Sequence, residues 1–274
     1  MIAFLGTGKL AEAIIRGALG AAALSREQVL VTCRRPERAA ELRALGLRVA
    51  SDLAELKAAD LAILGVRHRD VAALLANARD FLSRKTIVSL ATGVPSNVIE
   101  RLVPGARVIR AIANAPAEVG LAMTALSAGA SATDADMTEA RKLFSAVGKV
   151  VELPEALLDA ANAISGAGPA YLYAYARALA EAGASIGLER SVALTMATQT
   201  LVGAAALLAN SNGSFQQLIA EVAGKGGSTR AALEVLEQGG LDSLLASAVK
   251  AALVRAQERN AESQVPTDAT PASS

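Results

Sequence analysis

The sequence predicts an α/β protein with two domains: an N-terminal Rossmann-like domain with a doubly wound, mainly parallel sheet, and an all-α C-terminal domain. Short apolar runs alternate with helical patterns over the first 150 residues, which is typical of parallel βαβ units. After Pro154 the strand pattern stops and helical composition continues into the early 260s. We therefore expect a dinucleotide-binding domain at residues 1–152, a helical domain at residues 153–260, and a disordered polar tail at residues 261–274.

The expected strands are short runs of apolar residues, in chain order IAFL, VLVT, LAILGV, TIVSL and RVIRAI, with GKVVELPE as the last. Helical patterns lie between them at residues 9–24, 36–45, 52–57, 70–78 and 95–102. In the second domain, SGAGP, SIGLER, NSNGS and GKGGS separate the helices. In a parallel sheet of this kind, ligands bind at the carboxyl ends of the strands, so the residues that follow each strand are the candidates for a site.

Composition excludes several classes of function. The 274 residues are 53% hydrophobic, which is enough for one large or two smaller buried cores. The net charge is +1 and aromatic residues make up 3% of the chain, so no nucleic-acid partner is expected.

The expected location is the cytoplasm, without a membrane partner. The start MIAFLGTGKL lacks the features of a signal peptide, and charges and glycines are expected to interrupt the apolar stretches before the roughly 20 residues of a membrane helix. The single cysteine, Cys33, cannot form an internal disulfide, which fits a reducing compartment. We expect Cys33 to be a packing residue, and we expect no metal.

The first strand leads into a glycine-rich turn, Gly6-x-Gly8-x-x-Ala11, that opens a helix. Gly6 permits the tight turn, Gly8 lets a pyrophosphate approach the backbone, and Ala11 allows close packing of helix and strand. Unpaired amides at the helix start then meet the phosphates. We expect the cofactor to contact the residues of this turn, Gly6, Thr7, Gly8, Lys9 and Leu10, the alternative being an ordinary strand–helix turn.

The second strand ends in VLVTCRRPER, where an NAD-binding chain usually has an acidic residue for the ribose. Arg34 and Arg35 stand there instead, and guanidinium groups suit a 2′-phosphate. This favours NADP(H) over NAD(H). The alternative is two solvated arginines before a helix that begins with proline.

Further residues at strand ends are expected to line the same crevice: Val66, Arg67 and His68 in LGVRHRD, Ala91 in SLATGV, and Asn114 in AIANAPAEVG. Asn114 is a candidate to hydrogen-bond a cofactor amide or the substrate. His68, the only histidine, is either catalytic or an ordinary surface residue.

Three segments make the chain similar to the pyrroline-5-carboxylate reductase family: SGAGPAYLYAYARALAEAGASIGL, GGSTRAALEVLEQGGL and NAPAEVGLAMTAL. The resemblance reaches about Glu258. It implies a Rossmann domain, a helical dimerisation domain, and a homodimer that in some members assembles into larger rings. It also implies reduction of a small cyclic imine by a nicotinamide cofactor, with pyrroline-5-carboxylate giving proline as the expected reaction.

The resemblance also implies that the loop of Gly226, Gly227, Ser228 and Thr229 holds the substrate carboxylate. Backbone amides and hydroxyls at the start of a helix form an anion site, which agrees with this role. Thr229 is expected to donate to the substrate and is the candidate catalytic residue. Lys225 is expected either to pair with the carboxylate or to remain a solvated side chain.

The chain departs from the family pattern at three places. Gly224-Lys225 replaces Ser-Pro before the glycine pair, Arg67-His68 replaces Lys-Pro, and Ala115 stands where threonine is common. Two alternatives therefore stay open: a reductase of a different cyclic or carboxylated imine, or a catalytically silent NADP-binding dimer. The proton for the imine nitrogen can come from the substrate's own iminium, from water, from Thr229 or from His68. Of Tyr171, Tyr173 and Tyr175, at most one is expected to place its hydroxyl in the site.

Overall fold

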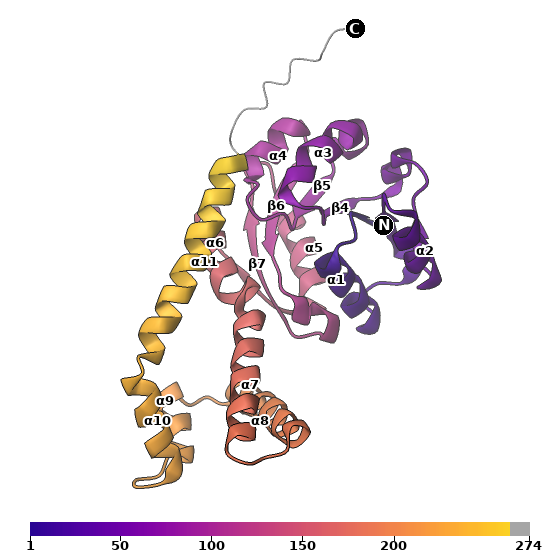
Figure 1. Ribbon diagram of the computed structural model, residues 1–274. Coiled ribbons are helices and arrows are strands. Elements are labelled where there is room, and N and C mark those ends of the chain that lie inside the picture. The colour runs from indigo at the N-terminus through magenta and orange to yellow at the C-terminus, as the bar shows by residue number, and fades with distance from the viewer. Residues whose placement is uncertain (264–274) are drawn as a thin grey trace. The chain divides into compact units, whose positions relative to one another are not determined.

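The computed structural model describes residues 1–263 and divides into two compact units (Figure 1). The first comprises residues 1–167 together with 252–263, and the second is Gly168–Ala251. The sequence places the boundary at residue 152, but the units divide later because residues 155–166 pack on the first domain. Leu158 is fully buried there in a small cluster with Ile112 and Ala125. Of the expected tail, residues 261–263 continue the last helix, and residues 264–274 lie outside the described part.

The first unit contains an eight-stranded sheet in the order β3-β2-β1-β4-β5-β6-β7-β8. Neighbouring strands are parallel except β6 and β7, which are antiparallel. The strands are β1 Ile2–Leu5, β2 Val29–Thr32, β3 Arg48–Val49, β4 Leu61–Leu64, β5 Thr86–Ser89, β6 Arg107–Ile112, β7 Ala122–Ala128 and β8 Gly148–Glu152. The expected doubly wound, mainly parallel sheet is confirmed.

Two strands were not anticipated from the sequence. β3 has only two residues, which is too short for a periodic pattern. β7 reads AMTALSA, a run with no Val or Ile, so its composition gives little strand signal. Its place in the sheet follows from its pairing with β6 and β8.

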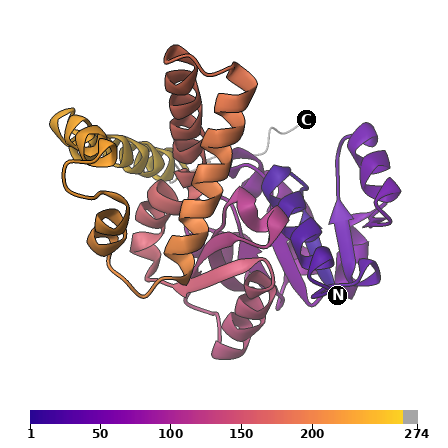
Figure 2. The same ribbon diagram turned by 90° about the horizontal axis from the view of Figure 1, so that it is seen from below.

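Helices cover both faces of this sheet (Figure 2). On one face α1 Lys9–Gly20, α2 Pro36–Ala44 and α5 Asp134–Ser145 bury Ile14, Leu42 and Phe144. On the other face the 3₁₀ helix η2 Leu53–Ala58 and the helices α3 His68–Leu82 and α4 Ser96–Leu102 bury Leu56, Leu75 and Ile99. The remaining short helical segments of this unit are η1 Arg26–Gln28, η3 Ala115–Val119, η4 Glu155–Leu157, α6 Leu158–Ala161 and the π-helix η5 Asn162–Gly166.

The strand order reverses between β1 and β4. The chain runs from β1 outward to β2 and β3, then returns to β4 on the other side of β1. The loops after β1 and β4 therefore leave the sheet on opposite faces and open a crevice at its carboxyl edge. This topology places the β1–α1 turn and the β4–α3 turn side by side.

The second unit is helical. Its helices are α7 Gly168–Ser185, α8 Arg190–Asn210, α9 Phe215–Val222, α10 Ser228–Gln238 and the first part of α11 Leu241–Ser263. α7 and α8 pack together, with Gly183 against Ala193 (Figure 1). Buried side chains are few, whereas large apolar ones such as Tyr173, Met196 and Leu207 are exposed. Within residues 1–263, α8 is the one helix whose length and apolar character would allow it to cross a membrane, so the expectation that charges and glycines interrupt every apolar stretch is wrong for this helix.

Candidate active site

The site begins at the turn between β1 and α1. Gly6 has φ of +86°, and a side chain there would overlap Val66 of the neighbouring turn. The main-chain N–H of Gly6 donates to Thr32 Oγ1 at 3.2 Å, which fixes the turn against β2. Gly8 is the N-cap residue of α1 and has no side-chain cap, so the first amides of the helix are available to a ligand.

Gly65 closes the other side of this turn. A side chain at Gly65 would overlap the carbonyl oxygen of Gly6 and the Cβ of Ala11. The close approach of Gly65 to α1 therefore explains why a small residue, Ala11, is needed at position 11. The sequence analysis did not single out Gly65, although its position directly after β4 is the available signal.

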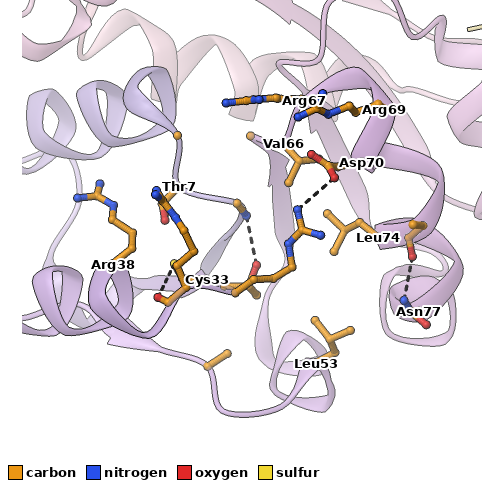
Figure 3. Close-up of a pocket in the computed structure, with 18 of the residues that line it drawn as sticks. Thr7, Cys33, Arg38, Leu53, Val66, Arg67, Arg69, Asp70, Leu74 and Asn77 are labelled. Carbon is orange, nitrogen blue, oxygen red and sulfur yellow. Dashed lines mark hydrogen bonds and ion pairs between the residues drawn. The ribbon is translucent and has the colours of Figure 1, made fainter.

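A cavity of about 700 Å³ lies in front of these turns. Of the expected cofactor-binding residues, seven line it: Gly6, Thr7, Gly8, Arg34, Arg35, Val66 and Arg67. Figure 3 shows Thr7, Cys33 and Arg38 on one side of it and Leu74 and Asn77 on the other. The hydroxyl of Thr7 is buried and has no hydrogen-bond partner among residues 1–263. A buried hydroxyl without a partner is costly, and here it belongs to a residue that lines the cavity.

Five expected cofactor-binding residues do not line the cavity. Lys9 and Leu10 form the first turn of α1, His68 begins α3, and Ala91 is buried just after β5. Asn114 is buried, and its amide is used within the protein: Oδ1 accepts from the Met123 N–H at 2.9 Å and Nδ2 donates to the Ser165 carbonyl at 3.0 Å.

The cavity has residues that the sequence analysis did not single out. They lie in the turn before η2, at the first residue of η2 and on one face of α3, and they include Ser51, Asp52, Leu53, Asp70, Ala73, Leu74 and Asn77. Positions 70, 73, 74 and 77 follow the spacing of one helix face, so helical periodicity could have found them once α3 was known to border the site. Glu55 holds the turn before η2, because its carboxylate accepts from the Ser51 N–H at 2.8 Å and from Arg48. These hydrogen bonds lower the pKa of Glu55 to about 2.

The arginines around the cavity differ in their partners. Arg38 pairs with Glu12 of α1 and with Glu41, so its charge is already neutralised. Arg34 Nη2 lies 3.1 Å from Asp70 Oδ1. The other arginines of the lining, Arg35, Arg67 and Arg69, are exposed and form no ion pair with a described residue. The cavity therefore has a positive rim suited to a phosphorylated ligand.

Glu12 connects the arginines around the cavity to α1, because it binds Arg38. Burial by itself raises the pKa of Glu12, but hydrogen bonds from Arg16 and Arg38 outweigh burial and hold the pKa below its ordinary value. Cys33, next to these groups, packs against the core and its thiol donates weakly to the Arg35 carbonyl at 3.5 Å. Among residues 1–263, no group of three or more His, Cys, Asp and Glu side chains is placed to hold a metal ion.

The expected substrate loop lies in the second unit, before α10. Gly226 has φ of +72°, which favours glycine, and Gly227 is the N-cap of α10 with no side-chain cap. Lys225 and Ser228 are exposed and Thr229 is half-buried. Within the described residues, these three side chains have no hydrogen-bond or ion-pair partner. The loop thus presents free helix amides, two hydroxyls and an ammonium group, which is the chemistry of an anion site. Of the three tyrosines on α7, Tyr173 and Tyr175 are exposed.

Comparison with known proteins agrees with this geometry. Residues 155–259 match the family described as pyrroline-5-carboxylate reductase dimerisation, and residues 1–93 match the family described as NADP oxidoreductase coenzyme F420-dependent. The chain is 33% identical to the pyrroline-5-carboxylate reductase of Pisum sativum over 94% of this chain and 95% of that protein. It is also 33% identical to that of Methanosarcina acetivorans over 95% of this chain and 97% of that protein.

Solved structures extend the comparison to the fold. A pyrroline-5-carboxylate reductase from Coxiella burnetii superposes with a TM-score of 0.87 at 30% identity, over 94% of this chain and 97% of that one. The Plasmodium falciparum pyrroline carboxylate reductase, determined with NADP bound, has a TM-score of 0.85 at 24% identity over 94% of this chain and 97% of that one. Both units of the chain thus have counterparts in a single known architecture.

Proposed function

Because the chain belongs to the pyrroline-5-carboxylate reductase family, we propose that it reduces 1-pyrroline-5-carboxylate to proline with a nicotinamide dinucleotide as the hydride donor. The observation that carries this proposal is the cavity at the β1/β4 crevice, which combines a glycine turn, free helix amides and an unpartnered Thr7 hydroxyl. The chain provides, in addition, a separate anion-binding loop at Gly226–Thr229.

The residues present fit a dinucleotide. The amides at the start of α1 and the hydroxyl of Thr7 would bind the pyrophosphate, and the apolar side chains of Leu53 and Leu74 would enclose the adenine. A bound reduced nicotinamide supplies the hydride. Preference for NADP(H) over NAD(H) is supported by Arg34 and Arg35 at the end of β2 and by the absence of an acidic residue at that position.

The loop before α10 would hold the substrate by its carboxylate. The amides of Ser228 and Thr229 and the ammonium of Lys225 suit this group, and fixing the carboxylate would orient the ring toward the hydride donor. We assign Thr229 as the residue that donates to the substrate. The proton for the ring nitrogen comes from the substrate's iminium, from water, from Thr229 or from His68.

We propose a homodimer, assembled through the apolar faces of the second unit. This agrees with the dimerisation family matched by residues 155–259 and with the exposed apolar side chains of α7 and α8. A partner subunit covers the apolar surface of α8 without the need for a membrane. Each site would combine the dinucleotide cavity of one chain with the loop of the other, and dimers can assemble further. A cytoplasmic location and the lack of a nucleic-acid partner complete the proposal.

A reductase of a different cyclic or carboxylated imine is the second candidate. It is favoured by Lys225, which stands where proline is usual in the family, and by Arg67 and His68 in place of Lys-Pro. A silent NADP-binding dimer is the third. All three bind dinucleotide, so turnover separates them.

The test is to purify the protein and follow NADPH oxidation with pyrroline-5-carboxylate, 1-pyrroline, and six-membered cyclic imines with and without a carboxylate. We expect pyrroline-5-carboxylate to have the highest kcat/KM, with proline as product. Turnover of another imine alone would support the second candidate. Dinucleotide binding without turnover of any imine would support the third.

A further inference from the structure

One ion pair joins two walls of the dinucleotide cavity. Arg34 comes from the loop after β2, Asp70 comes from the first turn of α3, and the two residues are 36 positions apart in the chain. Their Nη2 and Oδ1 atoms are 3.1 Å apart, and both residues line the cavity. Figure 3 draws this contact as a dashed line to Asp70. A carboxylate therefore stands within a rim that is otherwise rich in arginine.

The pair is easily exchanged for a stronger partner. The side chain of Arg34 is 83% exposed and that of Asp70 is 28% exposed, and ion pairs this open to solvent contribute little stability. A phosphate carries up to two negative charges and accepts paired hydrogen bonds from a guanidinium group. Arg38 already binds two carboxylates, with Nη2 on Glu12 and Nη1 on Glu41, so its charge is less available to a phosphate than that of Arg34. A 2′-phosphate that binds Arg34 must therefore either displace Asp70 from Nη2 or bind the remaining N–H groups beside the negative charge of Asp70.

We propose that Asp70 is a specificity-determining residue that weakens the preference for NADP(H), because its carboxylate competes with the 2′-phosphate for Arg34. NAD(H) carries no phosphate at that position, so the Arg34–Asp70 pair persists when it binds. This inference rests on the proposed function, in that it takes the cavity to be the dinucleotide site. It assigns a role to a residue that lies on a different element from the arginines at the end of β2.

The test compares the dissociation constants of NADP⁺ and NAD⁺ for Asp70→Asn by titration calorimetry, without any imine present. We expect NADP⁺ to bind about two- to fivefold more tightly, as a partly exposed charge pair implies, and NAD⁺ to bind as before. Asp80→Asn is the matched control, because Asp80 is an exposed carboxylate of the same helix outside the cavity lining. The fragments 2′,5′-ADP and 5′-AMP should reproduce the difference.

The double variant Arg34→Ala/Asp70→Asn identifies the mechanism. Without Arg34, removing the carboxylate should no longer favour NADP⁺ to the same extent, so the two changes should not be additive. An unchanged ratio of the two dissociation constants in Asp70→Asn, or an equal shift in Asp80→Asn, would overturn the inference while leaving imine reduction intact. If the unmodified protein bound neither dinucleotide, the proposed function itself would fail, and this inference with it.

Discussion

The Nδ2 of Asn114 donates a hydrogen bond to the main-chain carbonyl of Ser165 at 3.0 Å and thereby ties the end of β6 to the π-helix η5. The Oδ1 of the same side chain accepts from the N–H of Met123 at 2.9 Å, at the start of β7. Asn114 thus connects three segments that are distant in the sequence. Its position at a strand end resembles that of a ligand-binding residue, but its amide is engaged by the protein.

Asn114→Ala is expected to lower the free energy of unfolding by about 1–3 kcal/mol, because it leaves the Met123 N–H and the Ser165 carbonyl without this partner. We expect the dissociation constant of NADP⁺ to change little. Urea unfolding and calorimetry measure the two effects separately. Asn114→Asp keeps an acceptor for Met123 and loses the donor to Ser165, so its free energy of unfolding should be lower than that of wild type as well. A large loss of NADP⁺ affinity at unchanged stability would instead make Asn114 a cofactor contact.

Thr7→Val should weaken NADP⁺ binding by roughly 10- to 100-fold, since a hydrogen bond to a charged group contributes about 1.5–3 kcal/mol. The stability of the protein without cofactor should stay the same or rise, because the variant removes a buried hydroxyl that has no partner in the described part of the chain. Thermal unfolding with and without NADP⁺ measures both. Thr7→Ser, which keeps the hydroxyl, is the control. Equal NADP⁺ affinity in the two variants would argue against a phosphate contact.

Asp136 makes the stability of the protein depend on pH. It lies at the amino ends of β5 and β6, away from the cavity at the carboxyl ends of the strands. Burial by itself raises its pKa, but hydrogen bonds from Thr133, Thr86 and Arg107 outweigh burial and hold the pKa well below its ordinary value. The two carboxylate oxygens lie 2.9 and 3.0 Å from Arg107 Nε. Since the folded-state pKa is the lower one, this stabilisation is fully present above the unfolded pKa of about 3.9 and is lost as the pH falls through the folded value.

Asp136→Asn should therefore cost about 2–3 kcal/mol at neutral pH. The difference in the free energy of unfolding between the variant and wild type should stay constant down to roughly pH 5 and shrink below about pH 4. Urea unfolding at pH 7, 5 and 3 measures it. Asp134→Asn, on the same helix and exposed, is the control and should show no such convergence. A gap that persists unchanged at pH 3 would contradict the ionic origin.

Lys225→Ala should raise the KM for pyrroline-5-carboxylate about fivefold with little change in kcat, as loss of one partly exposed charge contact implies. The KM for 1-pyrroline, which lacks the carboxylate, should be unaffected. Lys250→Ala removes an exposed lysine elsewhere in the second unit and serves as the control. If both imines respond equally, or neither does, Lys225 is a solvated loop residue.

A composite site predicts complementation between two inactive variants. Gly8→Ala should fold, because an added Cβ would come no closer than 3.6 Å to its nearest neighbour, Gly65 O. It should nevertheless lose dinucleotide binding, because the Cβ would occupy the place of the pyrophosphate. Thr229→Ala should bind dinucleotide and reduce the imine poorly.

Co-expression of the two variants should restore about a quarter of wild-type activity, since half of the randomly formed dimers are mixed and each has one intact site. The specific activity of the mixture is compared with that of each variant alone. If each site were built from one chain, mixing would restore nothing. Thermal unfolding confirms that both variants are folded.

Much of the fold was readable because its signals are local. The Gly6-x-Gly8 turn after an apolar strand, the alternation that followed, and the glycine loop at Gly226–Gly227 before a helix are all patterns of neighbouring residues. β7 was not predicted, because its small residues give no strand signal and its place depends on pairing with β6. The division into compact units after Ala167 was not predicted either, because it depends on a tertiary contact, the packing of Leu158 against the sheet.

The sequence by itself determined the doubly wound architecture and the glycine turn after the first strand, because backbone conformation and burial pattern act over a few neighbouring positions. The family followed from the resemblance of three segments. Only the tertiary structure decided which charged and polar groups meet. Arg38 is taken by Glu12, Arg34 is shared with Asp70, and Asn114 serves Ser165. These partners stand 26, 36 and 51 positions apart. No local pattern encodes such contacts, since they arise only when the strands are ordered in the sheet and the helices pack on its faces.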